Sequence, residues 1–153
     1  APVTLTPPRA HRLQRRRFML ACAVTLTEYV ANGARELSDE QIGAFRARTI
    51  PELALKMAST QHEADGELLP ITRFLLRVAA EFDDYCNSAS VSTVTREAVF
   101  ALMYFLEEDD AIPDSEAELG YRDDAMIGRA MIRHHSAELK PFADACGQPW
   151  HWD

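Results

Sequence analysis

Apolar residues recur at intervals of three and four along most of the chain, which is the spacing of one face of an α-helix. The longest such stripe consists of Ile71, Phe74, Leu75, Val78, Phe82, Tyr85 and Cys86. A second stripe consists of Val99, Leu102, Met103 and Leu106. No stretch alternates apolar and polar residues with the period of a β-strand. The pattern predicts an all-α, single-domain bundle or orthogonal array of five to seven helices.

Start and stop signals divide this pattern into separate helices. We expect a first helix over residues 8–32, ended by Gly33. Ser38 and Gln41 form a capping box, in which each side chain bonds the backbone of the other residue. A second helix should therefore run over residues 38–47.

Further signals follow along the chain. Residues 49–52 resemble another capping box and predict a separate short helix, because Pro51 is tolerated in a first turn. Ser90 or Ser92 should cap the helix that carries the second stripe. A last helix is expected over residues 123–145.

The helices are expected to form one domain with short extensions. Residues 1–8 read as an extended, proline-rich lead, residues 9–149 as the helical domain and residues 150–153 as a tail. Gly147 is expected to end the last helix. The two tryptophans of the tail should pack on the bundle, with an aromatic binding cage as the alternative.

Charge is distributed unevenly in this chain of 153 residues, whose formal net charge is −8. Residues 1–17 contain five arginines and no acid, whereas residues 81–124 contain thirteen acids and two arginines. An acidic surface repels nucleic-acid phosphates and attracts basic proteins or cations. We therefore expect no nucleic-acid partner. No apolar run approaches the roughly 20 residues of a membrane span, so no membrane association is expected either.

Three cysteines are present, at Cys22, Cys86 and Cys146, and they lack the short spacing of a metal site. An odd number argues against a complete disulfide framework and favours a reducing compartment, hence a cytoplasmic protein. Cys22 and Cys86 lie in apolar helical stretches and are expected to be small core residues.

Residues 104–124 depart furthest from a plain helical bundle, because they contain nine carboxylates and one arginine. Pro113 disfavours helix at the preceding residue, and Gly120 permits a positive φ. We therefore expect a turn-rich connection between them, with helix resuming near Asp123.

This stretch resembles the core signature of the YkvA-like family of small bacterial helical domains. The family pattern is Asp-Leu-Ile-Pro-Asp, a short apolar link and Leu-Gly-Tyr-x-Asp-Asp, preceded by an aromatic helix end. The matching residues are Tyr104, Asp110, residues 112–114, residues 119–121, Asp123 and Asp124. The match covers 21 of the 153 residues without a gap. It implies a helical fold and brings no established activity with it.

The departures from that signature are acidic. Glu107, Glu108 and Asp109 stand where the family has Ser-Pro-Ile, and Glu116 and Glu118 stand in the link that is apolar in the family. These five residues are expected to bind a basic protein partner, which complementary charge would select and steer. The chain then reads as a non-enzymatic binding or regulatory protein, for example of the immunity or inhibitor type.

Two alternatives remain for the aspartates of the stretch. They can cap turns and helices. They can also form a hard-metal site, because carboxylate oxygens are the ligands that Mg²⁺ and Mn²⁺ prefer. A bound metal would suit a phosphohydrolase. The candidate ligands are Asp110, Asp114, Asp123 and Asp124.

Other polar residues give weaker signals, and no catalytic residue is assigned. His134 and His135 are adjacent, so they point in different directions on a helix and one should pack inward. Asp83 and Asp84 end an apolar helix and are expected to be solvated.

Overall fold

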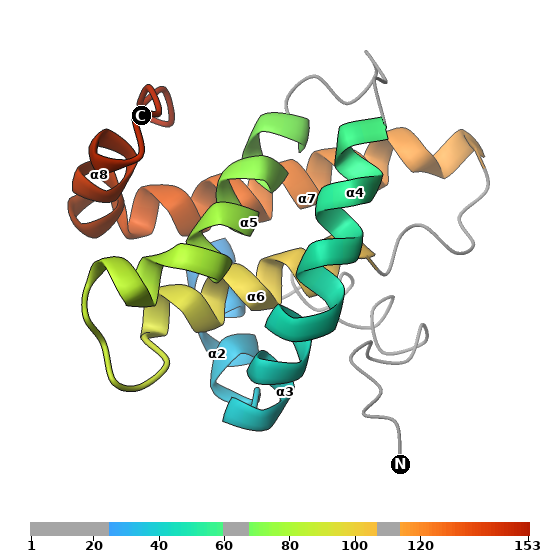
Figure 1. Ribbon diagram of the computed structural model, residues 1–153. Helices are drawn as coiled ribbons and strands as arrows, with labels where there is room; N and C mark the ends of the chain where they lie inside the picture. Colours follow the sequence, from blue (N-terminus) through green and yellow to red (C-terminus); the bar gives the residue numbers. More distant parts are fainter. Residues whose placement is uncertain (1–24, 60–67, 107–113) are drawn as a thin grey trace.

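The computed structural model describes the backbone of residues 25–59, 68–106 and 114–153, and the side chains of these ranges except those of residues 56–59, 68 and 114–123. The described elements are α2 (Leu26–Arg35), α3 (Asp39–Ala44), the π-helical turn η1 (Phe45–Thr49), α4 (Ile50–Ser59), α5 (Leu68–Tyr85), α6 (Thr93–Leu106), α7 (Asp114–His134) and α8 (Ser136–Ala145). The predicted all-α architecture is confirmed, and the described residues contain no strand (Figure 1).

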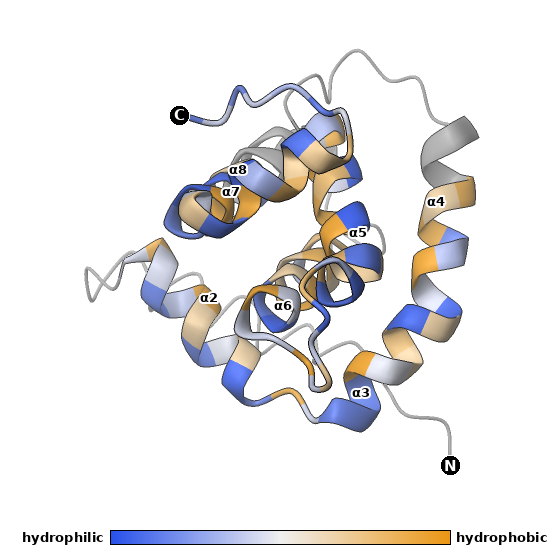
Figure 2. Cartoon of the chain, turned by 60° about the vertical axis from the view of Figure 1, so that its left-hand side comes forward, coloured by the Kyte–Doolittle hydropathy of each residue, from blue (hydrophilic) through white to orange (hydrophobic). Residues whose placement is uncertain are grey.

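Helix α6 forms the centre of the molecule. It packs against α2, α5 and α7, and Figure 2 shows it in the middle of the other helices. Residues 97–104 are all buried, so the helix is enclosed on every side rather than along the one stripe that its sequence suggests. The small side chains of Ala98 and Ala101 allow the surrounding helices to approach closely.

Helix α2 begins later and ends later than predicted. Thr25 has an extended backbone and caps the helix, since its Oγ1 accepts from the Glu28 N–H at 3.1 Å. A continuous helix over residues 8–32 is therefore wrong at Thr25, and residues 1–24 lie outside the described residues. Gly33 does not end α2, which continues to Arg35. A Cβ at Gly33 would lie 2.2 Å from Cε2 of Phe100, so this glycine permits close packing of α2 on α6.

The capping box at the start of α3 is confirmed. The Ser38 N–H donates to Gln41 Oε1 at 2.8 Å, and the Gln41 N–H donates to Ser38 Oγ at 3.1 Å. The predicted break before residues 49–52 is wrong, because α3, η1 and α4 follow one another without interruption. The Ile50 N–H bonds the carbonyl of Phe45, five residues back. This wider turn accommodates Pro51, which has no N–H to donate and would crowd a regular helix.

The apolar stripe of α5 is buried, as predicted, from Ile71 through Phe82. The buried stripe ends at Phe82, because Tyr85 is 44% exposed and Cys86 is exposed. The expectation that Cys86 is a core residue is therefore wrong. Asn87 adopts a φ of 53° and turns the chain away from α5. Ser92 caps α6 by accepting from the Thr95 N–H at 3.1 Å, which confirms one of the two predicted caps.

The carboxyl-terminal region forms two helices where one was predicted. Helix α7 begins at Asp114 and contains Gly120, so the expected turn and positive φ at Gly120 are wrong. Alanine, leucine and glutamate favour helix, and acids near a helix N-terminus complement its dipole. His135, with φ −103° and ψ 24°, separates α7 from α8.

Helix α8 ends as predicted. Gly147 has a φ of 69°, and the Gln148 N–H donates to the carbonyl of Ala143, as in a Schellman motif. The chain then turns back, and Trp152 becomes buried in the bundle, as expected for the tail. In the part of the chain that the structure describes, no helix combines the length and apolar character needed to cross a membrane.

Candidate functional site

The five acids predicted to bind a partner fall into two groups. Glu107, Glu108 and Asp109 lie outside the described residues. Glu116 and Glu118 belong to the first turns of α7, so part of the expected loop is helical. Their role in partner binding stays a prediction.

Two of the four aspartates considered as metal ligands lie far apart on the backbone of one helix. Asp114 and Asp123 are nine residues apart on the continuous helix α7. This spacing separates their backbones by about 14 Å along the axis, whereas the oxygen ligands of one ion lie within about 2.6 Å of it. Asp124 is buried, with 1% of its surface exposed, and Asp110 lies outside the described residues. The backbone spacing does not favour one ion shared by Asp114 and Asp123, and the metal site stays a prediction.

A carboxylate that the sequence reading assigned to solvent is instead buried in a polar network. Asp83, at the end of α5, is 7% exposed. Its Oδ2 accepts from Arg46 Nη2 at 2.6 Å, and its Oδ1 accepts from Thr95 Oγ1 at 2.9 Å. The Ser92 N–H also points to Oδ1, at 3.3 Å. Burial raises the pKa of Asp83, but the hydrogen bonds from Ser92, Arg46 and Thr95 outweigh it and leave this pKa below its usual value.

The network joins three parts of the fold. Arg46 belongs to η1, Asp83 to α5, and Ser92 and Thr95 to the start of α6. Arg46 also donates through Nε to the carbonyl of Ala79 at 2.9 Å. The neighbouring Asp84 is exposed, as predicted. Asp83 therefore has a structural role.

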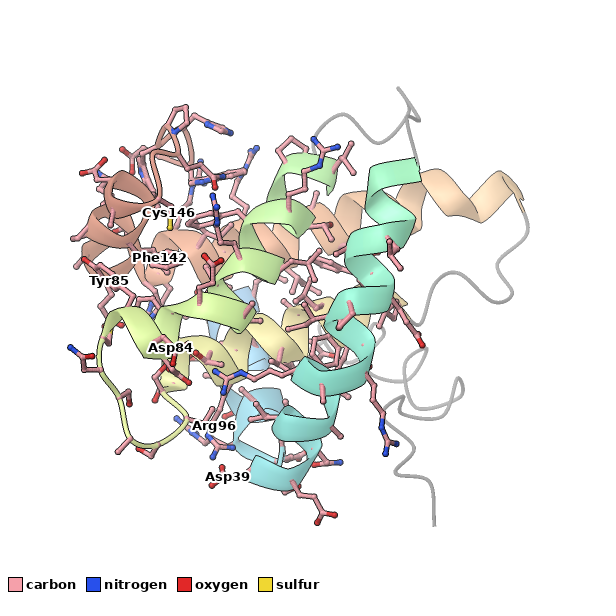
Figure 3. All side chains as sticks on the ribbon, viewed as in Figure 1. Asp39, Asp84, Tyr85, Arg96, Phe142 and Cys146 are labelled. Atoms are coloured by element: carbon pink, nitrogen blue, oxygen red, sulfur yellow. The ribbon has the colours of Figure 1, made fainter. Side chains whose placement is uncertain are left out.

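Hydrogen bonds of Arg96 join α6 to the start of α3. Arg96 donates through Nη1 to the carbonyl of Leu37 at 2.6 Å and through Nη2 to Asp39. Figure 3 shows Arg96 and Asp39 side by side at the lower edge of the bundle. This contact fixes the turn before α3 against the central helix.

Glu97 and His135 form a buried pair, with Nε2 of His135 2.8 Å from Oε2 of Glu97. Their side chains are 2% and 10% exposed. His134 is exposed, so the expected division between one inward and one outward histidine is confirmed. A carboxylate that orients an imidazole is also found in general-base catalysis. This pair is buried between the helices and lies at the junction between α7 and α8.

The described residues include two cysteines, and the surroundings of one of them affect its thiol. Cys86 and Cys146 are free thiols. Although Cys86 is exposed as a residue, partial desolvation and the carboxylates of Asp83 and Glu138 raise the pKa of its thiol. A raised pKa leaves little thiolate at neutral pH, and the thiolate is the reactive form.

The burial of Asp83 could have been predicted from helical periodicity. Asp83 follows Leu75 by eight residues and Ala79 by four, so it continues the apolar face of its helix. A carboxylate on such a face predicts a buried partner. The identity of the partner, Arg46, depends on the tertiary fold. Glu97 gave no comparable signal, because burial on every side of α6 is also a property of the whole fold.

Comparisons with known proteins found no match among protein-family models, curated proteins or solved structures.

Proposed function

We propose that this protein is a non-enzymatic binding or regulatory protein that engages a basic protein partner through an acidic surface in residues 107–124. The observation that supports this proposal is the concentration of charge. Residues 104–124 contain nine carboxylates and one arginine in a chain whose net charge is −8.

Three acids of the described part of residues 81–124 are buried within the bundle. Asp83 bonds Arg46, and Glu97 bonds His135, so these two carboxylates contribute to packing within the bundle. Asp124 is buried as well. The acids of residues 107–118 are additional to these three. Because complementary charge increases association rates and selects partners, such a cluster suits recognition of a basic surface.

Immunity-type or inhibitor-type binding fits the same chemistry. A small acidic helical protein can cover the basic surface with which a nuclease or toxin binds nucleic acid. Its carboxylates and the nucleic-acid phosphates would compete for the same lysine and arginine side chains. The odd number of cysteines favours a reducing compartment such as the cytoplasm for this activity. The matching spacing around Asp110 and residues 119–121 supports membership of the YkvA-like family as part of the same proposal.

Charge reversal tests the proposed surface. The first variant replaces Glu107, Glu108, Glu116 and Glu118 with lysine. A matched control replaces four acids that the structure shows to be exposed on other elements, namely Glu40, Glu52, Asp84 and Asp144. Both variants change the net charge by the same amount. The wild type and the two variants are each immobilised. Proteins that bind to them are eluted with a salt gradient and identified by mass spectrometry.

The expected result is a basic partner that binds the wild type and the control but not the first variant. Its affinity, measured by calorimetry at two salt concentrations, should fall as salt increases. Because acids near a helix N-terminus are favourable, Glu116→Gln with Glu118→Gln provides a milder variant if lysine disturbs α7. Equal loss of binding in the first variant and the control would show a general effect of charge and refute this surface.

A further inference from the structure

Residues 148–153 form a strap that follows α8 and contacts two other helices. The strap has no regular secondary structure and contains both tryptophans of the protein, Trp150 and Trp152. Figure 1 shows the chain ending beside α8. Intrinsic tryptophan fluorescence therefore reports on this segment alone.

Three contacts hold the strap against the bundle, and one of them is the edge-to-face contact of Trp150 with Phe74, whose ring centroids are 6.1 Å apart. The indole of Trp152 is 2% exposed and stacks on the ring of Phe74 from α5, with ring centroids 5.8 Å apart and planes inclined by 26°. Arg133 of α7 donates through Nε to the carbonyl of Trp152 at 2.7 Å. The ring of Phe74 and the guanidinium of Arg133 thus define a socket for one aromatic residue and its carbonyl.

The polar contacts at the end of the strap are exposed. Trp150 Nε1 donates to Asp153 at 3.1 Å, and Lys140 pairs with Asp153 at 3.2 Å with side chains 48% and 69% exposed. Exposed pairs contribute little to stability. The buried indole N–H of Trp152 has no acceptor among the described residues, which penalises the docked state.

Helix α8 is held far more firmly than the strap. It contributes Leu139, Phe142 and Ala143 to the main core, each at most 1% exposed. Figure 3 shows Phe142 beside Tyr85, and their ring centroids are 5.4 Å apart. Separating α8 would expose this group of side chains, whereas separating the strap would expose Trp152, which belongs to the same core, the packed part of Trp150 and the ring of Phe74. Segments with few buried contacts open at lower free energy than the core.

We propose that the strap releases from Phe74 while the helices stay folded, and that the vacated socket binds a tryptophan side chain of a partner peptide. The occupant is inferred from Trp152 itself, whose flat ring matches the face of Phe74 and whose carbonyl matches Arg133. This socket is independent of the acidic surface described above.

Thermal unfolding of the wild type tests the release. Tryptophan fluorescence follows the strap, and circular dichroism at 222 nm follows the helices. The fluorescence midpoint should lie several degrees below the midpoint of helix melting. Coincident transitions would show that strap and helices unfold together, and would overturn the proposal.

A pair of arginine substitutions tests the anchor. Arg133→Met removes the bond to the Trp152 carbonyl and should lower the fluorescence midpoint while changing helix melting little. Arg77→Met is the control, because Arg77 is exposed and pairs only weakly with Glu81 at 3.2 Å. It should leave both midpoints in place. An equal shift of both transitions in Arg133→Met would contradict a separable strap.

A peptide tests the socket. Trp152→Ala should retain a cooperative helix transition, and an acetylated peptide with the sequence of residues 148–153 should raise its midpoint in proportion to concentration. The same peptide with alanine in place of Trp152 should have no effect. The socket is refuted if the tryptophan peptide leaves the midpoint unchanged. A Trp152→Ala protein without a cooperative transition would show that the helices depend on the strap, which also refutes the proposal.

Discussion

Individual polar residues in this protein owe their roles to partners that are far away in the sequence. Asp83 depends on Arg46, which precedes it by 37 residues, and Glu97 depends on His135, which follows it by 38. Helical periodicity can identify the face on which such a residue lies, but it cannot identify the opposite side chain. Periodicity places Asp83 on the apolar face of its helix but does not identify Arg46, whereas the capping box of Ser38, whose partner lies three residues away, was predicted correctly.

Asp83 should make folding dependent on acid pH. Its pKa is lowered in the folded state, so its stabilising effect is complete well above about pH 4, the usual value of an aspartate, and is lost as the pH falls through the lower folded value. We expect Asp83→Asn to cost about 2 kcal/mol at pH 7, the scale of a hydrogen bond to a charged group. The difference from wild type should shrink below pH 4.

Chemical denaturation at pH 7 and pH 3 measures this effect. Asp84→Asn is the matched control, because Asp84 is the exposed neighbour of Asp83. It should change the free energy of unfolding little at either pH. A destabilisation by Asp83→Asn that is equally large at pH 3 would contradict the role of the charge.

Helices form where the sequence predicts them, but their ends and faces depend on neighbouring elements. Gly33 was expected to stop α2, and it instead allows α2 to approach α6. Pro51 was expected to begin a new helix, but the π-helical turn η1 connects α3 to α4 without a break before Pro51. The start of α7 was predicted near Asp123 and lies at Asp114, because Pro113 and Gly120 were interpreted as helix breakers although the residues between them favour helix.

A pair of glycine substitutions tests the packing of α2 on α6. Gly33→Ala places a Cβ 2.2 Å from the ring of Phe100 and should cost about 1–3 kcal/mol, as overpacking does. Gly43→Ala meets no atom within 4 Å and should stabilise α3 by about 0.5–1 kcal/mol, the helix preference of alanine over glycine. Urea unfolding compares the two variants. Similar effects of both would show that helix preference outweighs packing at Gly33.

The continuous helix α7 also predicts the response to metal ions. The nine-residue spacing of Asp114 and Asp123 does not favour one ion shared by both. If the aspartates only cap turns and helices, millimolar Mg²⁺ or Mn²⁺ should leave the thermal midpoint unchanged, since only an ion that binds the folded state stabilises it. Calorimetric scans with and without metal measure this, with Ca²⁺ as a control for general ionic effects. A rise specific to Mg²⁺ or Mn²⁺ would restore the metal hypothesis for a subset of the aspartates.

For the whole molecule, the sequence predicted the architecture but not the arrangement. The apolar stripes of residues 71–82 and 99–106 were sufficient for an all-α bundle, because each helix must bury such a face. Which helix lies at the centre depends on how all the faces meet. The acidic residues 107–118, where the proposed partner surface lies, were identified from composition alone.

The central position of α6 has a consequence for synthesis of the protein. Translation adds about 5–20 residues per second, and α6 is completed about 70 residues after the end of α2. The apolar face of α2 must therefore wait roughly 4–14 seconds for the surface that covers it. Helix α5 is synthesised during this interval and also lacks its partner α6 until the interval ends. The nascent chain should be most prone to aggregation, and most dependent on chaperones, just before α6 leaves the ribosome.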